Sequence, residues 1–201
     1  MLHLLSPSNR ETAYNDYDVM FLLEKLAEAA GRGKMIGRGG LSGTLGIGEG
    51  LVRSMLQRLK ATGFVNVTRA GVTLGENGRS FLDAVKVSVM ELEHTDSAIG
   101  THQVSLLVRG RAHLIGKGVE QRDSGLKAGG DGCTTIVCRE GRLVLPPEWS
   151  IDDNSPSLAA QIHGYGVTDG DVVLIGGSNT GVREAAAAAN SAALALLDQN
   201  R

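Results

Sequence analysis

The chain has 201 residues, of which 42% are hydrophobic and 21% are charged, values that are ordinary for a globular protein. The sequence contains no apolar run of about 18 residues, which excludes a membrane-spanning helix. Its opening segment is too short and too weakly apolar for a secretory signal, so we expect a cytoplasmic protein. Aromatic residues make up only 3% of the chain, so aliphatic side chains and alanine must form its core.

The net charge of −2 argues against a chain that is basic throughout, but the basic residues are concentrated in one region. Residues 1–84 carry a net charge of +2, whereas residues 85–201 carry −4. Between residues 32 and 69 a single acid, Glu49, accompanies seven basic residues, which are Arg32, Lys34, Arg38, Arg53, Arg58, Lys60 and Arg69. Such a local excess of positive charge is what a phosphate-facing surface requires, and a merely solvated polar surface is the alternative.

The first predicted helix covers residues 18–30 and ends at Gly31. Its apolar side chains recur at helical spacing and should form one buried stripe, consisting of Val19, Leu22, Leu23, Leu26 and Ala30. Residues 31–40 are predicted to be a glycine-rich, basic connector with little helical propensity. A short apolar turn follows, with Leu41, Leu45 and Ile47 on its apolar side.

A longer helix is predicted over residues 49–63, with Gly63 as its C-terminal cap. Residues 64–68 and 72–74 then alternate between apolar and polar side chains around a turn at residues 69–71, which indicates a hairpin. Residues 76–85 return to a helical pattern. Helix, short helix, tight turn, longer helix and hairpin form the order of a winged helix-turn-helix, so we expect residues 1–84 to bind duplex DNA.

The longer helix has one apolar face, formed by Val52, Met55, Leu56 and Leu59. On the opposite face we expect Arg53 and Gln57 to contact base edges, because the N-terminal part of a recognition helix lies nearest the bases. The other expected DNA-binding residues are Ser54, Arg58 and Lys60 near phosphate, Gly50 where the backbone approaches closely, and Arg69 at the tip of the wing. Arg32, Lys34 and Arg38 either touch phosphate or belong to a flexible basic loop.

Residues 85–201 are predicted to form a second domain of α/β (α+β) class, a small α/β sandwich that senses a ligand or mediates dimerisation. Strands are expected over residues 85–94, 103–110, 133–141, 142–147 and 170–177, and helices over 118–128, 156–165 and 180–200. The run at residues 170–177 is apolar throughout, which is typical of a strand that is buried on both faces. Cys133 and Cys138 should lie on opposite faces of one strand as two reduced thiols.

Two places in this second domain could bind a ligand. A glycine turn before the last helix, with Gly177, Ser178, Asn179 and Thr180, could bind an anionic small-molecule effector, although a plain helix cap has the same pattern. The polar cluster of Glu120, Arg122 and Asp123 is either a buried ligand site or a solvated helix surface. The five histidines are scattered without the spacing of metal ligands, so we expect no metal, no cofactor and no catalytic set.

Two long segments resemble known archaeal sequences. Residues 45–82 resemble the winged-helix segment of archaeal predicted transcriptional regulators, in which a Gly-x-Gly turn leads into a Val-Arg recognition helix and the wing leads into a Leu-x-x-x-Gly helix start. Residues 118–147 and 169–178 resemble the C-terminal domain of unknown function that follows the winged helix in one archaeal family. The resemblance implies the same two-domain architecture and a regulatory role, and it supplies no effector.

The sequence therefore predicts a DNA-binding transcriptional regulator that acts as a homodimer, without a membrane partner. One alternative is an enzyme of small-molecule metabolism with a fused winged helix, which would use the turn near Ser178 for an anionic substrate. The other is a winged helix that makes only protein contacts.

Overall fold

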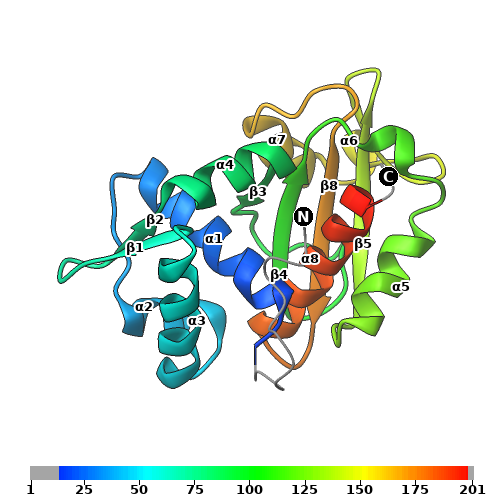
Figure 1. Ribbon diagram of the computed structural model, residues 1–201. Helices are drawn as coiled ribbons and strands as arrows, with labels where there is room; N and C mark the ends of the chain where they lie inside the picture. The colour runs from blue at the N-terminus through cyan, green and yellow to red at the C-terminus, as the bar shows by residue number, and fades with distance from the viewer. Residues whose placement is uncertain (1–13, 199–201) are drawn as a thin grey trace. The chain divides into compact units, whose positions relative to one another are not determined.

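The computed structural model describes residues 14–198 of a chain that divides into two compact units, residues 1–85 and 86–201 (Figure 1). The division lies one residue from the expected boundary. Within the described residues, the N-terminal unit contains four helices and a two-stranded antiparallel sheet. In chain order its elements are α1 (Asp16–Gly31), α2 (Arg38–Leu45), α3 (Glu49–Ala61), β1 (Val65–Val67), β2 (Val72–Leu74) and α4 (Glu76–Val85).

Helix α1 begins two residues earlier than the sequence predicts, because a capping box fixes its start. The side chain of Asn15 accepts the backbone N–H of Asp18 at 3.1 Å, and the Asp18 carboxylate accepts the N–H of Asn15 at 2.9 Å. The predicted stripe is buried except at its end, where Ala30 is exposed and Ala29 is buried instead.

The prediction of a non-helical connector up to residue 40 was wrong at its end, because residues 38–40 form the first turn of α2. Leu41 and Leu45 of α2 are buried, and their burial stabilises a helix that its three glycines would otherwise disfavour. A three-residue turn then separates α2 from α3. Gly46 begins this turn in the left-handed backbone conformation with φ of 66°, which residues other than glycine rarely adopt.

Helix α3 buries its predicted apolar face and packs against α2 and β1. Strands β1 and β2 pair from Val65 opposite Leu74 to Val67 opposite Val72. Ile36 adds a bridge on the other side of β2, where its carbonyl accepts the N–H of Val72 at 3.0 Å. The element order predicted for this unit is therefore confirmed, and the bridge at Ile36 extends the hairpin toward a third strand.

The C-terminal unit is of α+β class, as predicted, and its described part contains one six-stranded sheet that is antiparallel throughout. The strands are β3 (Val87–Met90), β4 (His102–Val108), β5 (Gly132–Arg139), β6 (Arg142–Leu145), β7 (Trp149–Ser150) and β8 (Val172–Ser178), in the spatial order β3-β4-β8-β5-β6-β7. The helices are a short 3-10 helix, η2 (Ala112–Leu114), and α5 (Val119–Lys127), α6 (Ile151–Asn154), α7 (Pro156–Gly164) and α8 (Val182–Asp198).

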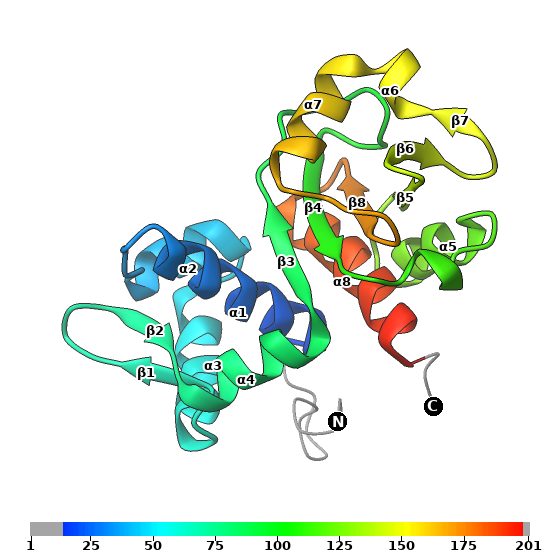
Figure 2. The ribbon, with the colours of Figure 1, turned by 90° about the horizontal axis from the view of Figure 1, so that it is seen from above.

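Figure 2 shows this sheet between two helical layers, with α6 and α7 on one face and α5 and α8 on the other. Side chains alternate along the strands, so each face of the sheet contributes apolar side chains to the core that it forms with the helices covering it. Leu107, Ile136 and Val173 belong to the apolar cluster with Leu158 and Ile162 of α7. Strand β8 lies near the middle of the sheet and is buried along its whole length, which confirms the expectation for this apolar run.

Two further expectations concern the cysteines and the membrane. Cys133 and Cys138 are both buried and unpaired thiols on β5. No helix within residues 14–198 combines the length and the apolar character that crossing a bilayer demands.

Gly176 determines how closely α8 approaches β8. A Cβ atom at Gly176 would collide with the backbone of Ala185 and Ala189. We expect Gly176→Ala to lower the free energy of unfolding by about 1–3 kcal/mol or more, because α8 must move away from the sheet. Chemical denaturation followed by circular dichroism measures this loss.

Gly164→Ala is the matched control, because Gly164 ends a helix and a Cβ there would meet no atom within 4 Å. This variant should be as stable as the unmodified chain or slightly more stable. Equal stability of the two alanine variants would contradict the close approach of α8 to β8.

Candidate nucleic-acid interface

The polar face of α3 forms a continuous exposed stripe. Glu49, Arg53, Gln57 and Lys60 follow one another at intervals of four, four and three residues, which places them on one side of the helix. All four are exposed, because the opposite side of α3 packs into the unit. Of the other predicted contacts, Gly50 and Ser54 are also exposed beside this stripe.

A groove of about 860 Å³ lies between the hairpin and the first turns of α2 and α3. Its lining comes from residues 37–39 of α2 and its N-cap, from Glu49 of α3, and from residues 67–72 of the hairpin. Arg38 and Arg69 both line the groove, one on each wall. The stripe on α3 therefore starts at a groove whose lining includes two arginines, Arg38 and Arg69.

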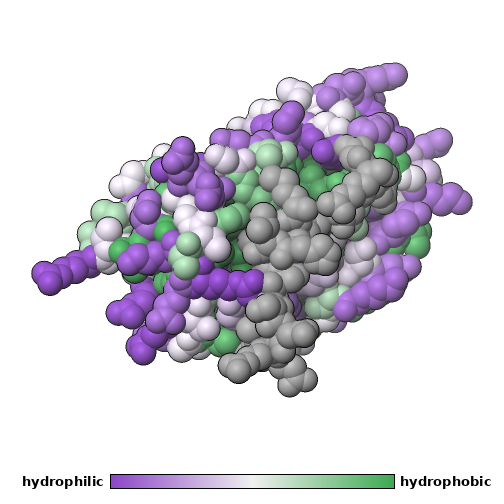
Figure 3. Space-filling view, in the orientation of Figure 1, coloured by the Kyte–Doolittle hydropathy of each residue, from purple (hydrophilic) through white to green (hydrophobic). Residues whose placement is uncertain are grey.

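Arg69 lies in the exposed loop that joins β1 to β2, as the sequence predicts. Thr68 shapes this loop, since its N–H and its hydroxyl donate to the carbonyl of Gly71 at 2.9 and 3.1 Å. In the space-filling view, a hydrophilic side chain projects at the tip of the hairpin (Figure 3). Arg69 is exposed in this loop.

The remaining basic residues differ in how accessible they are for contact with phosphate. Arg58 is half-buried on the side of α3 away from the stripe, which makes it the least accessible of the predicted phosphate contacts. Arg32 forms an ion pair with Glu28, with 3.3 Å between Nη2 and Oε1. Lys34 is exposed, and Arg38 belongs to α2 rather than to a flexible loop.

The glycine turn before α8 is already filled by the chain itself. Asn179 donates its backbone N–H and its side-chain Nδ2 to one carboxylate oxygen of Asp131, at 2.6 and 2.8 Å. Thr180 donates its N–H to the hydroxyl of Ser178, whose side chain is buried. The loop at Ile99 packs directly on Gly177. The predicted anion site is thus corrected, because the Asp131 carboxylate already accepts the hydrogen bonds that Asn179 would donate to an anionic ligand.

The polar cluster on α5 is a solvated surface, which was the simpler of its two interpretations. Glu120, Arg122 and Asp123 are exposed, whereas Gln121 and Gly125 face the sheet. Arg122 differs from the two acids in one respect. It borders a hollow of about 310 Å³ together with residues 96–99 and residues 132–134 of β5.

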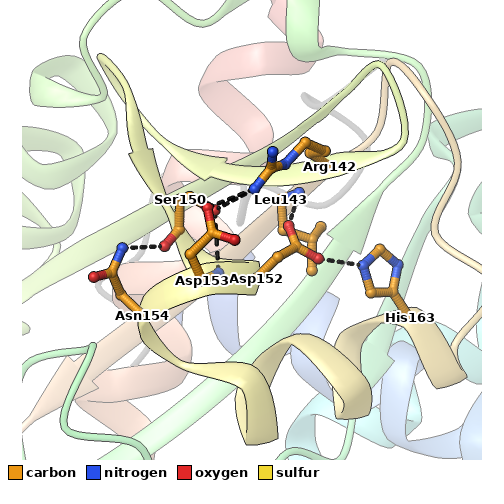
Figure 4. A network of polar contacts seen from close by, with 7 residues as sticks. All are labelled: Arg142, Leu143, Ser150, Asp152, Asp153, Asn154 and His163. Carbon is orange, nitrogen blue, oxygen red and sulfur yellow. Dashed lines mark hydrogen bonds and ion pairs between the residues drawn. The ribbon is translucent and has the colours of Figure 1, made fainter.

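A polar network joins β6 to helices α6 and α7 (Figure 4). Asp152 accepts the N–H of Leu143 at 2.7 Å and a ring nitrogen of His163 at 2.9 Å. Arg142 pairs with Asp153 beside it. Burial alone would raise the pKa of Asp152, but the hydrogen bonds from His163 and Leu143 lower it overall. The Asp152–His163 pair thus connects α6 to β6 and to α7, so its role is structural.

Asp171 closes the turn at the start of β8. Its carboxylate accepts hydrogen bonds from Arg109 Nη1 at 2.7 Å, from the N–H of Gly110 at 3.0 Å, and from the N–H and hydroxyl of Thr168 at 2.9 and 3.0 Å. Burial would raise the pKa of Asp171, yet these four donors hold it below its ordinary value of 3.8. Both carboxylates therefore stabilise the C-terminal unit in their charged forms.

Three comparisons place the chain among known proteins. Residues 99–196 match the family model described as "Domain of unknown function (DUF4443)", which covers slightly less than half of the chain. No curated protein matches significantly. Six chains of solved structures match, among them "Hypothetical protein PH0730 from Pyrococcus horikoshii OT3", with 22% identity, coverage of 92% of this chain and 94% of that chain, and a TM-score of 0.73.

The family match and the structural neighbour support one part of the predicted resemblance. The domain of unknown function is present where the sequence suggested it, and the structural neighbour is an archaeal protein. At 22% identity the likeness extends to the fold alone. The regulatory role stays a prediction.

Replacing Asp171 tests the turn at β8. We expect Asp171→Asn to lower the free energy of unfolding at neutral pH by about 1.5–3 kcal/mol, because the variant cannot form hydrogen bonds to a charged group there. The stabilisation by the carboxylate is present above pH 3.8 and disappears as the pH falls toward the lower pKa of the folded state. Stability should therefore fall more steeply below about pH 4 in the unmodified chain than in the variant.

Urea denaturation across this pH range provides the measurement. Asp96→Asn serves as the control, because the Asp96 side chain is fully exposed. Identical pH profiles for the unmodified chain and Asp171→Asn would contradict the role assigned to Asp171.

Proposed function

We propose that the N-terminal unit is a winged helix-turn-helix that binds duplex DNA, and that the protein is a transcriptional regulator. The observation that carries this proposal is the exposed stripe of Glu49, Arg53, Gln57 and Lys60, which begins in the groove between the hairpin and the helices. A helix that contacts bases must leave such a face free, and its first turns must be the most accessible.

The dimensions of α3 suit this role. Its 13 residues give a length of about 20 Å at 1.5 Å per residue. The major groove of DNA is about 12 Å wide and admits one such helix. Arg53 and Gln57 lie in the second and third turns of α3, where they would reach base edges, since both side chains can form two hydrogen bonds with a base.

Arg38 and Arg69 would bind the backbone of the duplex. A phosphate-bearing strand in the groove would lie between Arg38 of α2 and Arg69 of the hairpin, since both residues line it. Phosphate contacts of this kind position a protein on DNA without reading its sequence. The hairpin would then serve as the wing, with Arg69 at its tip.

Sequence preference should depend on the stripe of α3. We expect Arg53→Ala combined with Gln57→Ala to weaken binding to a preferred site by about 1–3 kcal/mol for each base that is no longer contacted, with little effect on binding to unrelated duplex. Fluorescence anisotropy with both duplexes measures the difference. Lys117→Ala removes an exposed cation from the C-terminal unit and is the matched control. Unchanged discrimination between the two duplexes would overturn the assignment of Arg53 and Gln57.

Arg69 should contribute in a different way. We expect Arg69→Ala to weaken binding to all duplexes to a similar extent, and to reduce the slope of log affinity against log salt by about 1, because the variant neutralises one phosphate fewer. Titrations at several salt concentrations give this slope.

The same titrations separate DNA binding from a winged helix that contacts only proteins. Binding to duplex that falls steeply with salt supports the proposal. A chain that binds no duplex even at low salt would leave the stripe as a protein-binding surface and would refute it.

A further inference from the structure

Glu49 is an acidic residue in the middle of the basic surface of the N-terminal unit. Between residues 32 and 69 it is the single acid beside seven lysines and arginines. It is exposed, it is the first residue of α3, and it lines the groove together with Arg38 and Arg69. A carboxylate at this place repels the phosphates that the basic residues attract. Its position therefore requires an explanation other than general attraction to DNA.

The carboxylate of Glu49 lies at the groove and is not neutralised there. Its Oε1 is 3.4 Å from the point where a Cβ of Gly39 would stand, which places it beside the first turn of α2. Arg53 follows Glu49 by four residues, a spacing at which helical side chains can form an ion pair. Within residues 14–198, however, the carboxylate accepts no hydrogen bond and forms no ion pair. Its oxygens are therefore available to a ligand.

The major groove of DNA offers few donors to a carboxylate. Cytosine N4 and adenine N6 carry amino groups there, whereas guanine presents acceptors and thymine presents an acceptor and a methyl group. The amino group of adenine lies beside the N7 acceptor, which a carboxylate repels, so glutamate pairs best with cytosine. Glu49 is at the N-terminal end of α3, and this part of a recognition helix lies nearest the base edges.

We propose that Glu49 determines specificity by accepting a hydrogen bond from the N4 amino group of a cytosine in the major groove. The inference rests on the proposed function and names the base that one residue of the same surface reads. With cytosine in place, the hydrogen bond offsets the repulsion between the carboxylate and the phosphates. With any other base the carboxylate has no suitable donor, and the complex is weaker.

The first position of a helix also favours an acid for a reason unrelated to DNA, because a carboxylate there interacts favourably with the helix dipole. Glu76 is the matched control for this effect. It is exposed and begins α4 as Glu49 begins α3, but it does not line the groove. Glu76→Gln should therefore reduce stability about as much as Glu49→Gln does, and it should leave DNA binding unchanged.

The test starts from a preferred site, selected from random duplex DNA with the unmodified full chain. Fluorescence anisotropy then compares this site with duplexes in which each base pair is replaced in turn. At one position the unmodified chain should prefer cytosine about five- to 150-fold, the cost of one mismatched base pair. Glu49→Gln should shift this preference to adenine, because an amide pairs with both N6 and N7 of adenine. Glu49→Ala should show no preference at this position.

Binding to unrelated duplex should change in the opposite direction. Glu49→Gln and Glu49→Ala should each bind such a duplex about two- to fivefold more tightly than the unmodified chain, because the charge that repels phosphate is absent. Glu76→Gln should match the unmodified chain with both kinds of duplex. Circular dichroism of each variant verifies that the chain is folded.

Three outcomes overturn the proposal. The base preferences of both Glu49 variants equal those of the unmodified chain at every position, or the preference that depends on Glu49 is for a base other than cytosine, or both variants bind unrelated duplex more weakly. In each case a sequence preference of the unmodified chain leaves the proposed function intact. An unmodified chain that binds no duplex overturns the proposed function and the role of Glu49 together.

Discussion

The burial of one face of α3 is the constraint on which the rest of the N-terminal unit depends. Val52, Met55, Leu56 and Leu59 are almost inaccessible, and the helix has no second apolar side. Their burial against α2 and β1 fixes the rotation of the helix about its axis. The polar residues of α3 consequently face outward as one stripe, and the groove lies where that stripe begins. The proposed contact with bases follows from this rotation more than from any single side chain.

The C-terminal unit is built on a different constraint, the close packing of α8 on the sheet. Gly176 admits the backbone of α8, and β8 is buried along its whole length. With α8 on one part of this sheet face and α5 on the other, α5 forms part of the outer surface. The unit thereby exposes Val119 and Leu126 on a rigid support.

Much of this fold could be predicted from the sequence, because its elements have strong local signals. The helical spacing of apolar residues in α3, the alternation in β1 and β2, and the apolar run of β8 each identify an element with its buried side. The predicted helix at residues 118–128 agrees with α5 and its two caps. Where local signals were weak, prediction failed. Residues 38–40 are helical because Leu41 and Leu45 are buried by tertiary contacts, which override the low propensity of glycine.

The candidate sites were harder to predict, because their state depends on residues distant in sequence. The turn at Ser178 and Asn179 has the pattern of an anion site, but the anion is Asp131, which lies 48 positions from Asn179. No local pattern could indicate that pairing. The hollow beside Arg122 was equally inaccessible to sequence reasoning, since the loop at residues 96–99 forms one of its walls. The exposed face of α3 was predictable because it depends on periodicity alone.

Selection of bound sequences from random duplex DNA with the full chain tests the central claim, that the outward face of α3 reads DNA, most directly. The account predicts that repeated rounds enrich one defined sequence, and that this site consists of two inverted half-sites if two copies bind together. A pool that remains random after repeated rounds, at a salt concentration where the chain still retains duplex, would contradict base reading by α3.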